Sequence, residues 1–212
     1  MGAKSWMLAY ADGNPTEILQ SNPTLDRQAT TALAKKLFPS DKLRPLDDSD
    51  LLSTCPPDDE IRIACFPGLS IVAAKEFGID FPSQLGRNFV EAGAGKTIYL
   101  HAMHSVVDWM AFAIWINGEL TRSLSLSPDS GIIEDIGPKL AFEKPYWAGE
   151  HQVFDEADED FAYPFPFHPL ELAEAALLEF FGYHLEGIIT SIQPETIPLA
   201  SLKRMKPKWK FW

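Results

Sequence analysis

The chain has 212 residues, of which 46% are hydrophobic, and this composition is typical of one globular domain with its own core. Its 30 acidic and 18 basic side chains give a net charge of −12 at pH 7. That balance argues against nucleic-acid binding, which requires cationic groups that replace phosphate counterions. It also disfavours adhesion to anionic membranes.

Signals for membrane insertion and export do not stand out in the sequence. The longest apolar run, Trp109 to Ile116, has eight residues, whereas a membrane-spanning helix needs roughly 20. The first residues lack an apolar stretch of signal-peptide length. Two cysteines, Cys55 and Cys65, are too few for a disulfide framework. We therefore expect a soluble, cytoplasmic protein without membrane contact.

The first third of the chain predicts strands that surround one helix. Residues 5–12 form a buried strand, and the helical spacing after Asn22-Pro23 continues to Leu37. A polar, proline-containing loop follows to about Glu60. The β-rich runs 61–66 and 69–75, joined at Pro67-Gly68, then predict a hairpin.

The strongest local signal lies in the middle of the chain. After a short helix over 82–91 and a strand over 97–104, Asn117-Gly118 separates two β-rich runs, 109–116 and 119–127. An Asn-Gly pair in this position predicts a two-residue hairpin turn.

The register of that hairpin follows from the turn and places Ile116 opposite Glu119 and Ala113 opposite Arg122. Alternation then predicts a core face that carries Trp109, Ala111, Ala113, Trp115, Leu120, Leu124 and Leu126, with Arg122 among them. The other face would carry Asp108, Met110, Phe112, Ile114, Thr121, Ser123, Ser125 and Ser127. We expect that second face to be partly covered and to leave a polar strip of hydroxyls open.

The last third contains one clear helix, which begins at Pro169 and is capped by Gly182. Residues 131–143 predict a short strand or helical turn, and the aromatic segment 161–168 predicts an extended stretch laid over the body. The basic, aromatic tail resembles an edge strand. Hairpins dominate, so we predict an α+β fold with a mainly antiparallel sheet of about six strands and flanking helices. One domain would span residues 1–200, with a tail at 201–212.

The sequence Gly95-Lys96-Thr97 is similar to the end of a phosphate-binding loop motif. Such a loop requires a glycine five positions before Gly95, where Val90 stands, and it must follow a strand and open a helix. Here the predicted helix precedes the stretch and a strand follows it. We therefore expect a helix-to-strand connector and no nucleotide site.

His101, His104 and Asp108 form the best metal-like or catalytic group in the sequence. Two imidazoles and a carboxylate are able to hold Zn²⁺ or Fe²⁺. Strand alternation, however, places His101 and His104 on opposite faces, so they meet only if the chain turns between them. Structural histidines, a non-metal polar site and a metal site all stay open, and no cofactor is expected.

Other polar residues offer weaker candidates. Glu134 is a candidate acid or base, and Trp147 and Glu150 are candidate ligand contacts. Serines at every second position, Ser123, Ser125 and Ser127, indicate one face of a strand rather than nucleophiles, and they are candidate ligand contacts as well.

Several long segments are similar to a known group of proteins. They are GAKSWMLAYADG, CFPGL, YLHAMHSVVDWMAFAIW, RSLSLSPDSGIIEDIG, PYWAGEH and PFHPLELAEAAL. Together they resemble a bacterial family classed as a domain of unknown function, over most of residues 1–190. The resemblance implies a bacterial, cytoplasmic, single-domain protein and carries no activity, cofactor or catalytic residue.

The leading functional hypothesis is a non-enzymatic binding or interaction protein with a protein partner. It rests on the absence of a recognisable catalytic signature, on the acidic charge, and on aromatic residues such as Trp147 and those of 161–167 that are suited to interfaces. The alternative is a small-molecule-binding protein or enzyme with a polar site on the strands of 97–127, built from His101, His104 and Asp108.

Overall fold

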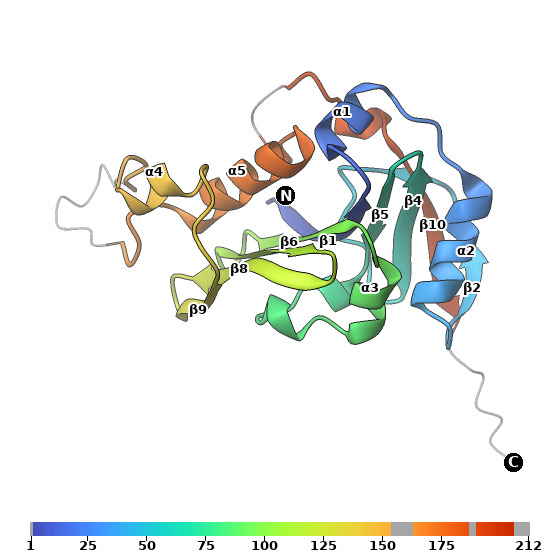
Figure 1. The fold of residues 1–212 in the computed structure, drawn as a ribbon, viewed down its shortest axis with the longest axis horizontal. Helices are drawn as coiled ribbons and strands as arrows, with labels where there is room; N and C mark the ends of the chain where they lie inside the picture. The colour runs from blue at the N-terminus through green and yellow to red at the C-terminus, as the bar shows by residue number, and fades with distance from the viewer. Residues whose placement is uncertain (1, 154–162, 187–189, 206–212) are drawn as a thin grey trace, which may run out of the picture.

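The computed structural model describes residues 2–153, 163–186 and 190–205, and within them a ten-stranded antiparallel sheet has helices on both faces (Figure 1). The strand order is β2-β10-β4-β5-β1-β6-β7-β8-β9, and β3 also pairs with β10. The strands are β1 (Lys4–Ala11), β2 (Lys42–Pro45), β3 (Ser49–Asp50), β4 (Glu60–Phe66), β5 (Leu69–Ala73), β6 (Thr97–His104), β7 (Trp109–Ile116), β8 (Glu119–Ser127), β9 (Gly131–Ile136) and β10 (Pro198–Met205). The helices are α1 (Pro15–Gln20), α2 (Arg27–Leu37), α3 (Arg87–Ala92), α4 (Lys144–Trp147) and α5 (Pro169–Phe181), with short 3-10 turns η1 (Lys75–Phe77), η2 (Pro82–Gln84) and η3 (Pro194–Thr196).

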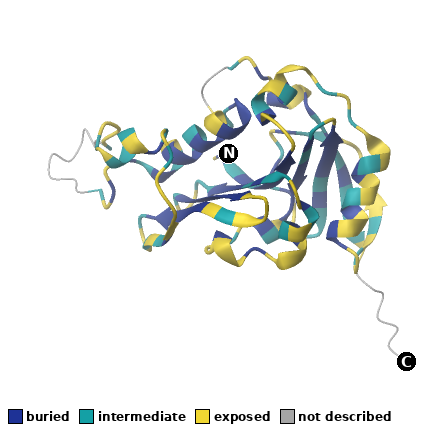
Figure 2. Ribbon diagram, in the orientation of Figure 1, coloured by how far each residue is buried: buried dark blue, intermediate teal, exposed yellow. Residues whose placement is uncertain are grey.

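Alternating side chains divide the core into two layers, one on each face of the sheet. The central strands are mostly coloured as buried in Figure 2. The α5 layer lies under α1 and α5 and includes Met7, Ile71, Phe112, Leu124, Leu177 and Phe180. The α2 layer lies against α2, α3 and η1 and includes Leu8, Leu37, Ile63, Phe77, Phe89 and Trp115. No helix of the described residues is long and apolar enough to cross a membrane.

The α+β class and the mostly antiparallel sheet are confirmed, but the expected count of about six strands is wrong. The expected loop before Glu60 contains β2 and β3, and both pair with β10, which lies far away in sequence. Both strands are short, with four and two residues, and their sequences carry no alternation that would mark them as strands. The expected boundary after residue 200 falls inside β10, which lies between β2 and β4. The aromatic end of the tail, 206–212, lies outside the described residues.

A bulge corrects the predicted hairpin register. Ile116 does pair with Glu119, but Thr121 is left over, and Ile114 rather than Ala113 pairs with Arg122. One extra residue reverses every later side chain. Leu124 therefore packs in the α5 layer, whereas the predicted register placed it on the same face of the sheet as Trp109 and Ala113.

The expected polar strip is not open either. Ser123 and Ser125 are fully buried on the α2-layer side, and Ser127 is 5% exposed. The prediction of an open row of hydroxyls is wrong, because helices cover the sheet on both faces and the face that carries Met110 and Phe112 is buried as well.

Candidate functional site

Helix α5 builds one wall of a cleft that is lined by both apolar and ionisable side chains. Pro169 opens the helix, the Nδ1 atom of the preceding His168 accepts the amide of Leu170 at 3.2 Å, and Gly182 ends it in the left-handed conformation. One stripe of the helix faces the core. The neighbouring stripe faces the cleft and consists of Leu170, Glu171, Glu174, Ala175 and Leu178.

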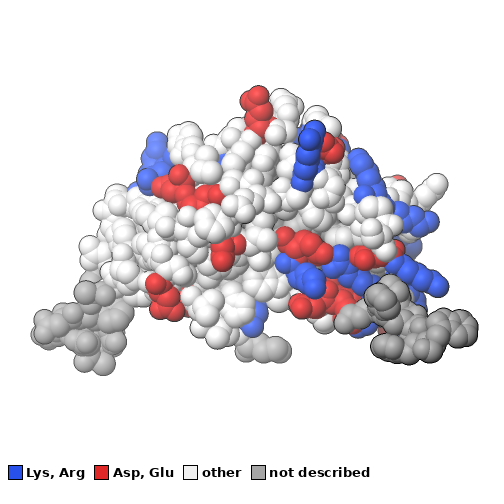
Figure 3. All heavy atoms as spheres, turned by 90° about the horizontal axis from the view of Figure 1, so that it is seen from below, with Lys and Arg blue, Asp and Glu red and all other residues white. Residues whose placement is uncertain are grey.

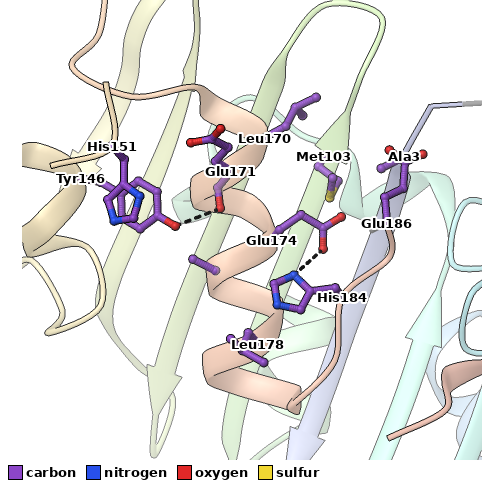
Figure 4. Close-up of a pocket in the computed structure, with 11 residues that line it drawn as sticks. Ala3, Met103, Tyr146, His151, Leu170, Glu171, Glu174, Leu178, His184 and Glu186 are labelled. Atoms are coloured by element: carbon purple, nitrogen blue, oxygen red, sulfur yellow. Dashed lines mark hydrogen bonds and ion pairs between the residues drawn. The ribbon is translucent and has the colours of Figure 1, made fainter. Parts of the chain in front are cut away.

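The chain turns back after α5 and supplies a second wall. Tyr183 is fully buried and its hydroxyl lies 3.9 Å from the sulfur of Met7, which anchors the turn to the sheet. His184 and Glu186 then line the cleft beside α5 (Figure 4).

Glu174 is the central polar group of the cleft. Its Oε2 atom accepts the amide of Leu185 at 2.9 Å and lies 3.4 Å from Nδ1 of His184. Its Oε1 atom is buried and has no hydrogen-bond partner among the described residues. A buried carboxyl oxygen without a donor is unfavourable, so this atom is suited to a donor from a ligand.

Burial sets the electrostatics of this pair. It raises the pKa of Glu174, an effect that the amides of Leu185 and Glu186 oppose, and it lowers the pKa of His184. Both shifts favour the uncharged forms. His184 is therefore neutral at pH 7, and the contact is not a strong ion pair.

The remaining walls are aromatic and apolar. The rings of Tyr146 and His151 stack with centroids 3.9 Å apart, and the Tyr146 hydroxyl donates to the carbonyl of Glu171 at 3.4 Å (Figure 4). Ala3 and Met103 contribute apolar surface from the sheet. The cleft has a volume of about 590 Å³, which is the size of a small-molecule site.

His101, His104 and Asp108 do not come together. His101 is fully buried on the face of the sheet that α5 covers, and its Nε2 lies 3.0 Å from the carbonyl oxygen of Ala173. His104 lies on the other face, where its ring is tilted against that of Trp6 with centroids 5.7 Å apart. Asp108 lies 3.7 Å from Nε2 of His168. No group of three potential ligands was found in 2–153, 163–186 and 190–205, so the geometry gives the metal hypothesis no support.

Glu134 and the serines form a structural contact on strands β8 and β9. Glu134 accepts the amide of Ser83 at 3.0 Å, the Ser83 hydroxyl and the Ser123 hydroxyl. These bonds tie η2 to the sheet. Ser127 accepts the amide of Ser130 at 3.1 Å. The oxygens that the sequence offered to a ligand are thus bonded within the chain, except that of Ser125, which lacks a partner in the described part.

The aromatic candidates are largely internal. Trp147 packs on Phe167 with centroids 4.9 Å apart and under the Lys139 ammonium at 4.7 Å, while Glu150 is exposed. Phe165 and Phe167 belong to the α5 layer, so these two rings do not form the exposed surface that we expected of 161–167, and residues 161 and 162 lie outside the described part.

Gly95-Lys96-Thr97 has the context that the sequence predicted. Helix α3 precedes it and β6 begins at Thr97, with Gly95 at φ +79°. Lys96 bonds Asp12. No helix N-terminus follows to offer amides to a phosphate.

Sequence reasoning missed the Glu174–His184 pair. In the sequence, Glu174 is one of several acidic residues in the helix that begins at Pro169, and His184 stands two residues after the capping Gly182. The only sequence signal for this site is weak. Glu174 stands four residues from both Leu170 and Leu178, so the three side chains lie on one face of the predicted helix.

Comparison with known proteins identifies a family but no characterised relative. A family of unknown function, DUF6928, matches residues 5–201. No curated protein and no solved structure matches significantly.

Proposed function

The chain belongs to this family of unknown function, and we propose that it is a binding protein whose ligand occupies the cleft beside α5. The proposal rests on one observation: a mostly apolar cleft of about 590 Å³ onto which a few polar groups converge, with Glu174 and His184 at its centre. Such clefts are the usual form of small-ligand sites, and shifted pKa values of carboxyl and imidazole groups accumulate there.

The composition of the lining favours binding over catalysis. Among the described residues that line the cleft, none is a serine, threonine, cysteine or lysine.

A second candidate keeps the site on the strands of 97–127. His104 and Ser127 line a smaller hollow of about 370 Å³ together with Trp6 and Trp109, whose indole nitrogen is buried without a partner in the described residues. This hollow would serve a small polar ligand, but it lacks a buried ionisable pair.

The test is to fill the cleft. We expect a screen of small molecules to find compounds that raise the melting temperature by roughly 5–10 °C at 100 times their Kd. Ala175→Phe places a ring in the cleft and removes that shift, because Ala175 lines the wall. Ala32→Phe is the matched control, since Ala32 is exposed on α2. Stabilisation that persists in Ala175→Phe would place the ligand elsewhere.

A further inference from the structure

The charged side chains that line the cleft are acidic. Glu171, Glu174 and Glu186 come from α5 and from the returning segment, and all three line the cleft. Lys4 is the one basic residue that lines the adjoining hollow, and no lysine or arginine of the described part lines the cleft itself. With His184 neutral at pH 7, the surroundings favour a cation.

Glu174 offers one free acceptor and not two. Its Oε2 atom is engaged by the amide of Leu185 and lies beside His184, whereas Oε1 has no partner in the described residues. A guanidinium binds carboxylates best through two parallel bonds, and that geometry would require both oxygens. An ammonium is a compact charge that needs a single strong acceptor, and its other donors are able to reach neighbouring groups.

Apolar surface continues away from this acceptor. Leu170, Leu178 and Met103 line the cleft, and the stacked Tyr146 and His151 rings form its far wall (Figure 4). Ala3 and Glu186 are shared with a second hollow of about 700 Å³, which is lined further by Leu52, Val106 and Leu185. Val106 is 74% exposed and Leu52 40%, so this hollow leaves apolar surface open to a ligand.

We infer that the ligand is a small primary amine with an apolar chain, whose ammonium group binds Glu174 and whose chain extends towards Leu52 and Val106. This inference rests on the proposed function of the cleft. The contact between the ammonium group and Glu174 gives specificity for amines, and the burial of the apolar chain contributes affinity.

The test uses calorimetry with the full-length protein to compare probes that share a six-carbon chain and differ in their polar group. We expect hexylamine to bind at least tenfold more tightly than hexan-1-ol, hexanoate or hexylguanidine. Glu174→Gln keeps the shape of the side chain and an acceptor for the Leu185 amide, so it lowers the affinity for hexylamine at least tenfold and leaves hexan-1-ol unchanged. Glu179→Gln is the matched control, because Glu179 is exposed on α5 and lines a different hollow.

The outcomes separate the two proposals. Equal binding of amine and alcohol, both abolished by Ala175→Phe, overturns the amine and keeps the cleft as a binding site. The same conclusion follows if Glu174→Gln and Glu179→Gln behave alike. If Ala175→Phe weakens the binding of none of these probes, nor that of an apolar fluorescent dye, the proposed function is wrong and so is the inference.

Discussion

Burial decides what individual polar residues do in this protein. His101 attracted attention as a ligand, but its ring is fully buried and its Nε2 donates to the carbonyl of Ala173, so it joins β6 to α5. Glu134 attracted attention as an acid or base, and it instead ties η2 to β8 and β9. Strand alternation correctly predicted that His101 and His104 lie on opposite faces of the sheet, because this prediction depends only on neighbouring residues of one strand.

His101 gives a pH-dependent prediction. Burial lowers its pKa from 6.5 to about 4, so the unfolded state takes up a proton at a higher pH than the folded state. The unfolding free energy therefore falls as the pH drops from about 6.5 towards 4, by about 3 kcal/mol in full. Urea titrations across this range check the size of the loss.

The variant His101→Gln isolates this contribution. Its amide is able to donate to the Ala173 carbonyl and does not titrate, so its stability curve is flatter over the same range. Parallel curves for the wild type and the variant would contradict the assignment.

At the scale of elements, local signals located most strands and helices correctly. The bounds of β6, the Asn117-Gly118 turn and the cap at Gly182 all follow from short-range rules. The errors arise where pairing is remote, as for β2 with β10, or where one inserted residue changes the pattern. The bulge at Thr121, whose hydroxyl donates to the carbonyl of Ile114 at 3.0 Å, has no sequence signature that we recognise.

The turn between β7 and β8 gives the second prediction. Asn117 and Gly118 have φ of +53° and +84°, and nothing lies within 4 Å of a Cβ at Gly118. Gly118→Ala therefore costs about 1–2 kcal/mol from backbone strain alone. Gly13→Ala is the control, because Gly13 has equal space and no positive φ, and we expect it to be neutral or slightly stabilising. Equal effects in thermal unfolding would show that strain is not the cause.

At the scale of the whole molecule, charges are arranged by tertiary contacts. Figure 3 shows Lys and Arg gathered at one end, near α2, β2 and β10, where acidic residues lie among them. Lys203 lies 2.8 Å from Asp59, and Arg204 bonds both Asp41 and Glu76. The described start of the basic tail therefore packs against the acidic residues of its own chain.

A buried ion pair fastens the α4 region to the sheet. Arg122 on β8 is 1% exposed and binds the fully buried Glu143 through two bonds of 2.8 and 2.6 Å, and it also bonds Asp135 on β9. Burial opposes the charge of Arg122, but the hydrogen bonds and charges of the two carboxylates outweigh this effect and raise its pKa.

Breaking this pair gives the third prediction. Arg122→Met removes the cation that pairs with the buried Glu143 and leaves it only the amide of Leu140 as a donor, so it lowers the unfolding free energy by about 3–5 kcal/mol. Arg27→Met breaks the exposed pair with Asp48 and costs less than about 1 kcal/mol. The double variant Arg122→Met with Glu143→Leu recovers part of the loss. Chemical denaturation measures all three, and similar small losses for Arg122→Met and Arg27→Met would contradict the role of the pair.

By itself the sequence determined the α+β class, the hairpins, the clear helix at Pro169 and the connector at Gly95-Lys96-Thr97, because each depends on residues that are neighbours along the chain. Only the tertiary structure decided the place of β10 inside the sheet, the face on which Ser123 lies, and the meeting of Glu174 with His184. The place of β10 depends on its pairing with the distant strands β2 and β4, the face of Ser123 on one bulge, and the meeting of Glu174 with His184 on the chain reversal after Gly182. These effects appear only once segments that are distant in sequence pack together.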